Sequence, residues 1–176
     1  IAYFWNAWKK TYFPSISVMK SQALKLLFAT FITGIIGGGL ILGIEHAATA
    51  MGYVTKDDAG HPKKAEIEML FGNLELVSIA LAAAGILIIA AVLFIRSYVS
   101  FEIQSKQAGW IGAVQGLCLP FRGFSRSGAT ISTGLLLGSL KARVEEFSFA
   151  LAVILTPIAI AREAWRLLKA NHAATI

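Results

Sequence analysis

The chain of 176 residues is 56% hydrophobic and only 15% charged, and its mean hydropathy is +0.67. Soluble domains carry about a quarter charged residues, so this composition excludes a water-soluble globule and predicts an integral membrane protein in contact with lipid. The net charge of +6 does not indicate a nucleic-acid partner, because the sixteen Lys and Arg residues are scattered between apolar segments. The single cysteine, Cys118, excludes an intrachain disulfide.

Residues 26–44 contain no charged side chain. As a helix they would be roughly 28 Å long, which is close to the hydrocarbon thickness of a bilayer, so we predict a transmembrane helix. Gly34 and Gly38, and likewise Gly39 and Gly43, keep the four-residue spacing that lets two membrane helices approach closely. We therefore expect these four glycines to lie in a helix–helix contact.

Residues 45–73 are polar and hold the Gly, Pro and Asp signals of a loop, which we predict to lie outside the membrane. Residues 76–95 form a second uncharged stretch and predict a second transmembrane helix. Residues 147–161 are shorter, and we expect them to span the membrane with help from flanking residues, with Pro157 accommodated as a local kink. Because the chain begins with Ile1 and helical patterns run close to both ends, we expect a piece of a longer protein.

Two uncharged stretches flank Arg122 and Arg126, and both are too short for a comfortable crossing. A short apolar helix, a Gly- and Ser-rich break and another short helix are typical of a re-entrant, broken helix pair. We predict such a helix-loop-helix over residues 109–140. The predicted fold class is therefore all-α: a polytopic membrane helix bundle that forms a single domain over residues 1–176.

The break between these short helices carries the chemistry. An unpaired arginine in hydrocarbon costs several kcal/mol, so we expect an anion to meet the two arginines. A helix that starts nearby would direct its free N–H groups to the same point, and the planar guanidinium suits phosphate oxygens. The alternative is a structural loop whose arginines pair with Glu145 or with backbone carbonyls. The predicted phosphate-binding loop consists of Arg122, Gly123, Ser125, Arg126, Ser127, Gly128 and Thr130.

The sequence between Gly112 and Phe149 carries a dense set of short motifs. Together they resemble the second signature region of the bacterial undecaprenyl-diphosphatase family, also called the bacitracin resistance protein family. The arrangement of apolar segments before these motifs is compatible with the same family, so the resemblance covers most of the chain. The motifs are Gly112-Ala113-Val114-Gln115-Gly116, Leu119-Pro120, Gly123-Phe124-Ser125-Arg126-Ser127-Gly128-Ala129-Thr130, Gly134-Leu135-Leu136-Leu137-Gly138 and Phe147-Ser148-Phe149.

The resemblance implies a multi-pass phosphatase of the bacterial inner membrane that hydrolyses undecaprenyl diphosphate to undecaprenyl phosphate and phosphate. Such an enzyme recycles the lipid carrier of peptidoglycan synthesis and confers resistance to bacitracin. The resemblance also implies a divalent cation, Mg²⁺ or Ca²⁺, with ligands outside this chain, and it is compatible with a homo-oligomer. Carried over by position, Ser125, Arg126 and Thr130 would be catalytic, and Gly123, Ser127 and Gly128 would form the phosphate-binding loop.

The loop departs from the family pattern at one point. The family usually has Pro-Gly directly, whereas Phe121 and Arg122 here stand between Pro120 and Gly123. Arg122 is then either a second phosphate-binding residue or a structural one. Gln115 precedes the break on an otherwise apolar helix, and we expect it either to hydrogen-bond the loop or to join two helices.

The other signature of the family, a Glu-rich segment ending in a Ser-Ser-Thr-Gly-His type run, has no counterpart in this chain. We expect it to precede Ile1, and we expect the present chain alone to be inactive. The second hypothesis is a transporter or flippase of a polyprenyl phosphate or another anionic substrate. Broken helices whose N-termini face an anion also build carriers, and a carrier would need no intramembrane Glu and His.

Overall fold

The computed structural model describes residues 15–51, 55–56, 62–63, 73–94 and 100–173. Helices make up almost all of this part of the chain, which confirms the predicted all-α bundle. The two strands, each of two residues, pair antiparallel within the segment that was predicted as an extramembrane loop. The elements are α2 (Ile16–Ala50), β1 (Thr55–Lys56), β2 (Pro62–Lys63), α3 (Leu74–Leu93), α4 (Ser105–Cys118), α5 (Arg126–Leu136) and α6 (Lys141–Ala173).

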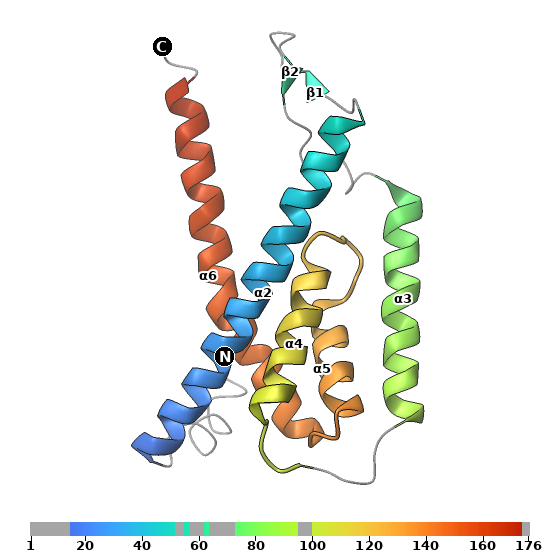
Figure 1. Cartoon of the computed structure of the whole chain (residues 1–176), viewed down its shortest axis with the longest axis vertical. Coiled ribbons are helices and arrows are strands. Elements are labelled where there is room, and N and C mark those ends of the chain that lie inside the picture. Colours follow the sequence, from blue (N-terminus) through green and yellow to red (C-terminus); the bar gives the residue numbers. More distant parts are fainter. Residues whose placement is uncertain (1–14, 52–54, 57–61, 64–72, 95–99, 174–176) are drawn as a thin grey trace.

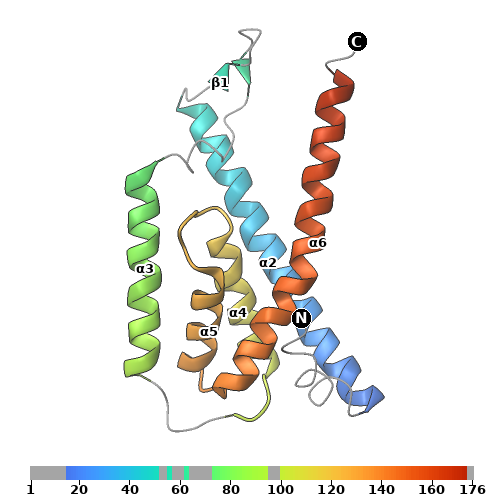
Figure 2. The same cartoon turned by 180° about the vertical axis from the view of Figure 1, so that it is seen from behind.

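The short helices α4 and α5 form a hairpin inside the bundle. They lie between α3 on one side and α2 and α6 on the other (Figures 1 and 2), and they contact all three long helices. The chain ascends through α4, turns at residues 119–125 within the length of the long helices, and returns through α5 (Figure 1). The hairpin therefore enters and leaves at the same end of the bundle, as the re-entrant prediction requires.

Three described helices are long and apolar enough, by length and composition, to cross a membrane. They are α2, α3 and the Lys141–Ala161 part of α6. Their outward faces carry large apolar side chains, for example Phe31 of α2 and Ile86 of α3, which are 67% and 68% exposed. Apolar surface of this extent suits contact with lipid and not with water. The chain is therefore a membrane protein.

The long helices extend beyond the predicted spans. The span predicted at 26–44 lies inside α2, so residues 45–50, which were assigned to the loop, are helical. Alanine is the best helix former and supplies three of these six positions, while Thr49 Oγ1 donates to the Glu45 carbonyl at 2.7 Å. The helix α6 likewise extends on both sides of the predicted 147–161 span and keeps Pro157 in its interior.

The contact between α2 and α4 is made by small residues. A Cβ atom on Gly112 would lie 2.4 Å from the Ala29 carbonyl oxygen, and one on Gly116 would lie 3.0 Å from the Gly37 nitrogen. Thr33 Oγ1 adds a 2.8 Å hydrogen bond to the Gly112 carbonyl. The backbones can approach this closely only because both helices carry small residues here.

The prediction that Gly34, Gly38, Gly39 and Gly43 make this contact is wrong for the described residues, because a Cβ on any of the four would meet nothing within 4 Å. Four-residue spacing identifies residues that share a helical face, but it does not say which face is buried. The buried stripe is Ala29, Thr33 and Gly37, each four residues after the last.

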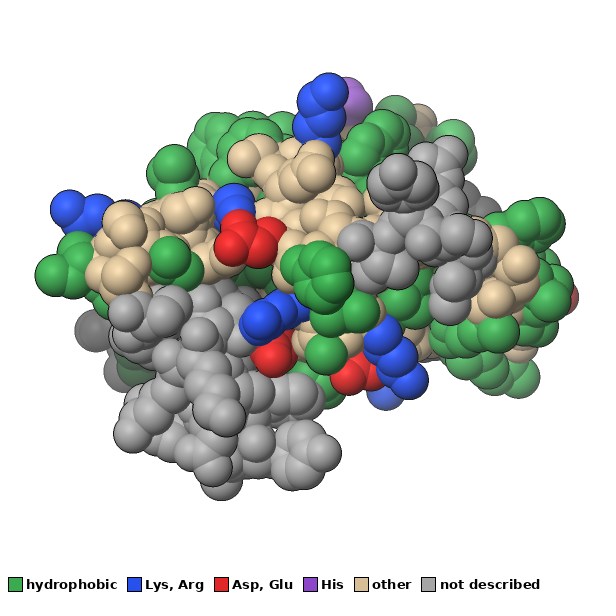
Figure 3. All heavy atoms as spheres, turned by 90° about the horizontal axis from the view of Figure 1, so that it is seen from below, with side chains coloured by type: hydrophobic (Ala, Val, Ile, Leu, Met, Phe, Trp, Pro, Cys, Tyr) green, Lys and Arg blue, Asp and Glu red, His purple; other side chains and the backbone are tan. Residues whose placement is uncertain are grey.

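The core lies at the base of the hairpin, where α2, α4 and α6 meet. Its fully buried side chains include Ile111, Val144, Phe147 and Leu151. Figure 3 shows this end of the bundle from outside, with basic and acidic side chains interspersed on its surface. The ion pairs at this end are Lys25–Glu102, Lys141–Glu145 and Arg143–Glu146, with N–O distances of 4.0, 3.8 and 3.1 Å.

Candidate functional site

The turn of the hairpin is shaped by one glycine and one serine. Gly123 has a φ of +95°, a left-handed conformation that side chains with a Cβ disfavour. A Cβ here would also lie 2.9 Å from the Val77 carbonyl oxygen, so the turn packs closely against α3. Ser125 then caps α5, and its Oγ accepts a 3.2 Å hydrogen bond from the Gly128 N–H. These two residues end the turn and start α5 at Arg126.

The start of α5 presents donors that no described residue uses. The first N–H groups of a helix lack carbonyl partners within it. The Ser125 side chain takes up the Gly128 N–H, and the Ala129 N–H donates to the Ser125 carbonyl. The N–H groups of Arg126 and Ser127 have no partner within the described part of the chain. They lie at the positive end of the α5 helix dipole, which favours an anion.

Two arginines stand beside these donors. Arg122, Ser125, Arg126 and Ser127 are all exposed at the tip of the hairpin, and neither arginine forms an ion pair with a described residue. The structural alternative pairs the two arginines with Glu145. The Glu145 Oε1, however, lies 3.8 Å from the Lys141 Nζ, so its carboxylate is paired with Lys141. The four side chains and the free N–H groups therefore form one cationic donor surface, which we call the hairpin tip.

Thr130 lies away from this surface. It is fully buried, and its Oγ1 donates to the Arg126 carbonyl at 2.9 Å. The same oxygen lies 2.6 Å from the Ser148 Oγ of α6. Ser148 was not among the predicted site residues, although the Phe147-Ser148-Phe149 motif places a hydroxyl in an otherwise apolar segment. The structure thus brings the hydroxyl of Thr130 to α6 and leaves the other predicted residues at the tip or next to it.

Gln115 lies on α4, close to one turn before the helix ends. Its side chain is 1% exposed, and its Nε2 has no hydrogen-bond partner among the described residues. Neither of the two contacts expected for this amide, to the loop or to another helix, is made by Nε2. Buried amide donors are rarely left without a hydrogen-bond partner.

The described residues provide no cluster of acidic and histidine side chains for the hairpin tip. The described residues hold no group of three or more His, Cys, Asp or Glu residues placed to bind a metal ion. His46 lies in the last turns of α2, His61 lies outside the described residues, and the side chain of His172 is not described. No described group of residues can therefore be assigned as the ligands of the divalent cation that the resemblance implies.

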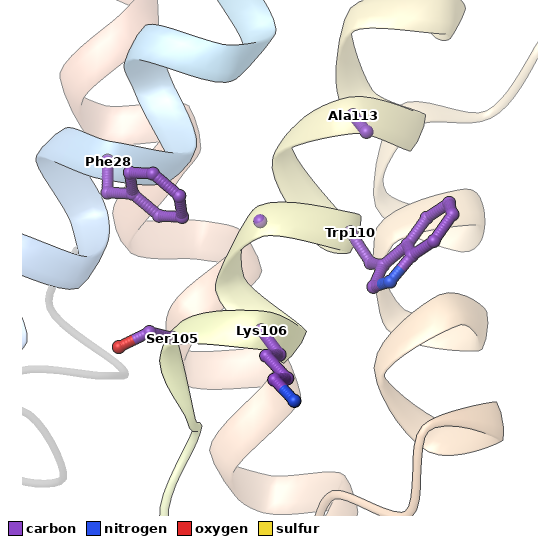
Figure 4. A pocket seen from close by; sticks show the side chains of 6 residues that line it. Phe28, Ser105, Lys106, Trp110 and Ala113 are labelled. Carbon is purple, nitrogen blue, oxygen red and sulfur yellow. The ribbon is translucent and has the colours of Figure 1, made fainter.

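An open groove of about 420 Å³ lies elsewhere, along the first half of α4. Figure 4 shows Phe28 on one wall and Trp110 on the other, with Lys106 at the lower end. A Cβ on Gly109 would lie 3.3 Å from Phe28 Cε1, so the glycine forms the floor. None of the predicted phosphate-binding residues lines this groove. It is lined by Phe28, Ser105, Lys106, Gly109, Trp110 and Ala113.

Comparison with known proteins connects this arrangement to a family. The family model described as bacitracin resistance protein BacA matches residues 1–175. Undecaprenyl-diphosphatase 2 of Acinetobacter baylyi is 51% identical over 175 residues, which are 99% of this chain and 58% of that protein. The undecaprenyl-diphosphatase of Bacteroides fragilis is 37% identical over 94 residues, or 51% of this chain and 34% of that protein.

A shorter match links the chain to the undecaprenyl-diphosphatase of Thermus thermophilus, which is 47% identical over 60 residues, or 34% of this chain and 23% of that protein. The chain thus spans at most 58% of the length of these relatives. The family model nevertheless covers nearly the whole chain, which confirms the resemblance inferred from the motifs between Gly112 and Phe149. The chain belongs to the bacitracin resistance protein BacA family.

Proposed function

We propose that the protein containing this chain is a membrane phosphatase that hydrolyses undecaprenyl diphosphate to undecaprenyl phosphate and phosphate. This reaction would recycle the lipid carrier of peptidoglycan synthesis and confer resistance to bacitracin, in a multi-pass protein of the bacterial inner membrane. The observation that carries the proposal is Arg126, exposed and unpaired among the described residues, on the first turn of α5 next to the turn of the hairpin. The names of the relatives support the same substrate.

The hairpin tip supplies the contacts that a diphosphate needs. The Arg126 guanidinium offers a planar set of donors to phosphate oxygens, and the free N–H groups of Arg126 and Ser127 add two more donors. Ser125 Oγ accepts from Gly128, so its own proton remains available for a phosphate oxygen. In phosphoryl transfer such fixed donors stabilise the charge that gathers on the transferred group. These residues bind and polarise the diphosphate.

The three residues predicted to be catalytic differ in their exposure. Ser125 and Arg126 are exposed at the tip and would contact the substrate, whereas Thr130 is buried with its hydroxyl on the Arg126 carbonyl. We therefore assign Thr130 to holding Arg126. Arg122 is exposed on the same tip, and we assign it to the second phosphate group of the substrate.

A divalent cation, Mg²⁺ or Ca²⁺, belongs to this proposal only through the family resemblance. The described residues do not fit one, because no group of three or more acidic, histidine or cysteine side chains comes together in them.

The proposal is tested by replacing Arg126 with Ala and with Lys in the full-length protein and measuring phosphate release from undecaprenyl diphosphate in detergent micelles. We expect Arg126→Ala to lose at least a hundredfold in rate, as is typical when a donor to a transition-state anion is removed. Arg126→Lys should recover little, because lysine lacks the planar pair of donors. Lys141→Gln is the matched control, since Lys141 is an exposed cation at the start of α6, at the base of the hairpin. Near-normal turnover of Arg126→Ala would overturn the proposal.

The second candidate function, a carrier of polyprenyl phosphate or another anion, is favoured by one observation. The described residues leave two N–H groups free at the start of α5 and hold no group of three or more acidic, histidine or cysteine side chains placed to bind a metal ion. Broken helices whose N-termini face an anion also build carriers. Proteoliposomes that hold the full-length protein distinguish the two functions. Movement of a fluorescent polyprenyl phosphate between leaflets, without release of phosphate from the diphosphate, would establish the carrier.

A further inference from the structure

The Ser148 side chain of α6 hydrogen-bonds directly to Thr130 of α5. It is 6% exposed and its neighbour in sequence, Phe147, is 1% exposed. A hydroxyl placed in such apolar surroundings is costly unless it is hydrogen-bonded. The Ser148 Oγ has one described partner, the Thr130 Oγ1 at 2.6 Å. The position of this hydroxyl is therefore set by Thr130.

The direction of this hydrogen bond follows from the other partners of Thr130. Its Oγ1 carries one proton and lies 2.9 Å from the Arg126 carbonyl oxygen and 3.2 Å from that of Ser127. Carbonyl oxygens only accept, and the Ser148 hydroxyl has no other described acceptor. All of these contacts are therefore made at once only if Thr130 donates to a carbonyl and Ser148 donates to Thr130. The result is a chain of donors that runs from Ser148 to Thr130 and ends on the carbonyl of Arg126.

We propose that Ser148 is a positioning residue for the phosphate-binding tip, acting through Thr130 on the backbone of Arg126. A hydroxyl that accepts one hydrogen bond becomes a stronger donor in the next, so Ser148 strengthens the hold of Thr130 on the first turn of α5. That turn carries the guanidinium and the free N–H groups that would meet the diphosphate. This proposal rests on the proposed function of the hairpin tip, and it adds a residue of α6 that fixes the geometry of the tip.

The competing explanation is that the hydrogen bond only ties α5 to α6 and contributes to stability. Thr33 provides a matched control, because its buried hydroxyl also joins two helices, with a 2.8 Å bond to the Gly112 carbonyl. Thr33 lies on α2 and makes no described hydrogen bond to α5. A purely structural loss should look the same in Thr33→Val as in Ser148→Ala.

The experiment compares Ser148→Ala, Thr130→Val, the double variant and Thr33→Val in the full-length protein, with phosphate release as the assay. We expect KM to rise roughly tenfold in Ser148→Ala, the factor that about 1.4 kcal/mol produces, with a smaller change in kcat. The double variant should be no worse than Thr130→Val alone, because Ser148 acts through Thr130. In Thr33→Val we expect less folded protein and an unchanged KM.

Two results would overturn the positioning role: an unchanged KM in Ser148→Ala, or effects of the two single substitutions that multiply in the double variant. Amide hydrogen exchange provides a readout independent of turnover. The peptide that covers residues 126–133 should exchange faster in Ser148→Ala and in Thr130→Val than in Thr33→Val. If the wild type releases no phosphate, the proposed function fails, and the exchange result alone still decides whether Ser148 holds this turn.

Discussion

Substitution of Gly123 by Ala tests whether the left-handed turn holds the hairpin tip against α3. A non-glycine residue in the left-handed region costs about 1–2 kcal/mol. The new Cβ would also lie 2.9 Å from the Val77 carbonyl oxygen and 3.0 Å from Val77 Cγ1, and such overpacking costs about 1–3 kcal/mol. Because the closer of these atoms is backbone, the turn has to move. We expect a total loss of roughly 2–5 kcal/mol of stability.

The matched control is Gly34→Ala, the same chemical change on α2. A Cβ on Gly34 meets nothing within 4 Å, and Ala in a helix interior is more favourable than Gly by about 0.5–1 kcal/mol. The thermal unfolding midpoint of the full-length protein in detergent should therefore fall for Gly123→Ala and stay level or rise for Gly34→Ala. Phosphate release should fall only in Gly123→Ala. A Gly123→Ala protein as stable as the control would refute the argument.

Three further substitutions test other parts of the site. Gln115→Leu should raise the unfolding midpoint, because it removes a buried amide whose Nε2 has no described partner and an unmet donor costs about 1–3 kcal/mol; a lower midpoint would show that the amide is used. Ser125→Ala should lower both the midpoint, by loss of a cap that contributes about 1 kcal/mol, and the affinity for diphosphate measured as KM. Arg122→Gln should raise the KM for the diphosphate and leave stability unchanged, and an unchanged KM would return Arg122 to a structural role.

The hairpin could be predicted from the sequence because its signals are local. Two short uncharged stretches interrupted by glycines, serines and two arginines are sufficient to indicate a broken helix pair at membrane depth. The left-handed turn falls on Gly123 and the cap falls on Ser125, and each of these residues has a direct conformational preference. No contact with the rest of the chain has to be known to place them.

The helix faces could not be predicted in the same way. A four-residue repeat of small residues occurs on more than one face of α2, and the α4 contact is made at Gly37 and not at Gly34 or Gly38. The burial of Thr130 against α6 could not be predicted for the same reason, since the spacing within α5 does not say which side α6 covers. In both cases the deciding information is the tertiary packing of a second helix.

The distribution of charge differs between the base and the tip of the hairpin. At the base of the hairpin each described carboxylate has a cation partner, as in the pairs of Glu145 with Lys141 and of Glu146 with Arg143. At the tip Arg122 and Arg126 have no carboxylate partner among the described residues. An uncompensated cation surrounded by low-dielectric walls attracts an anion more strongly than one in water. The tip is therefore suited to hold an anion, and under the proposed function that anion is the diphosphate.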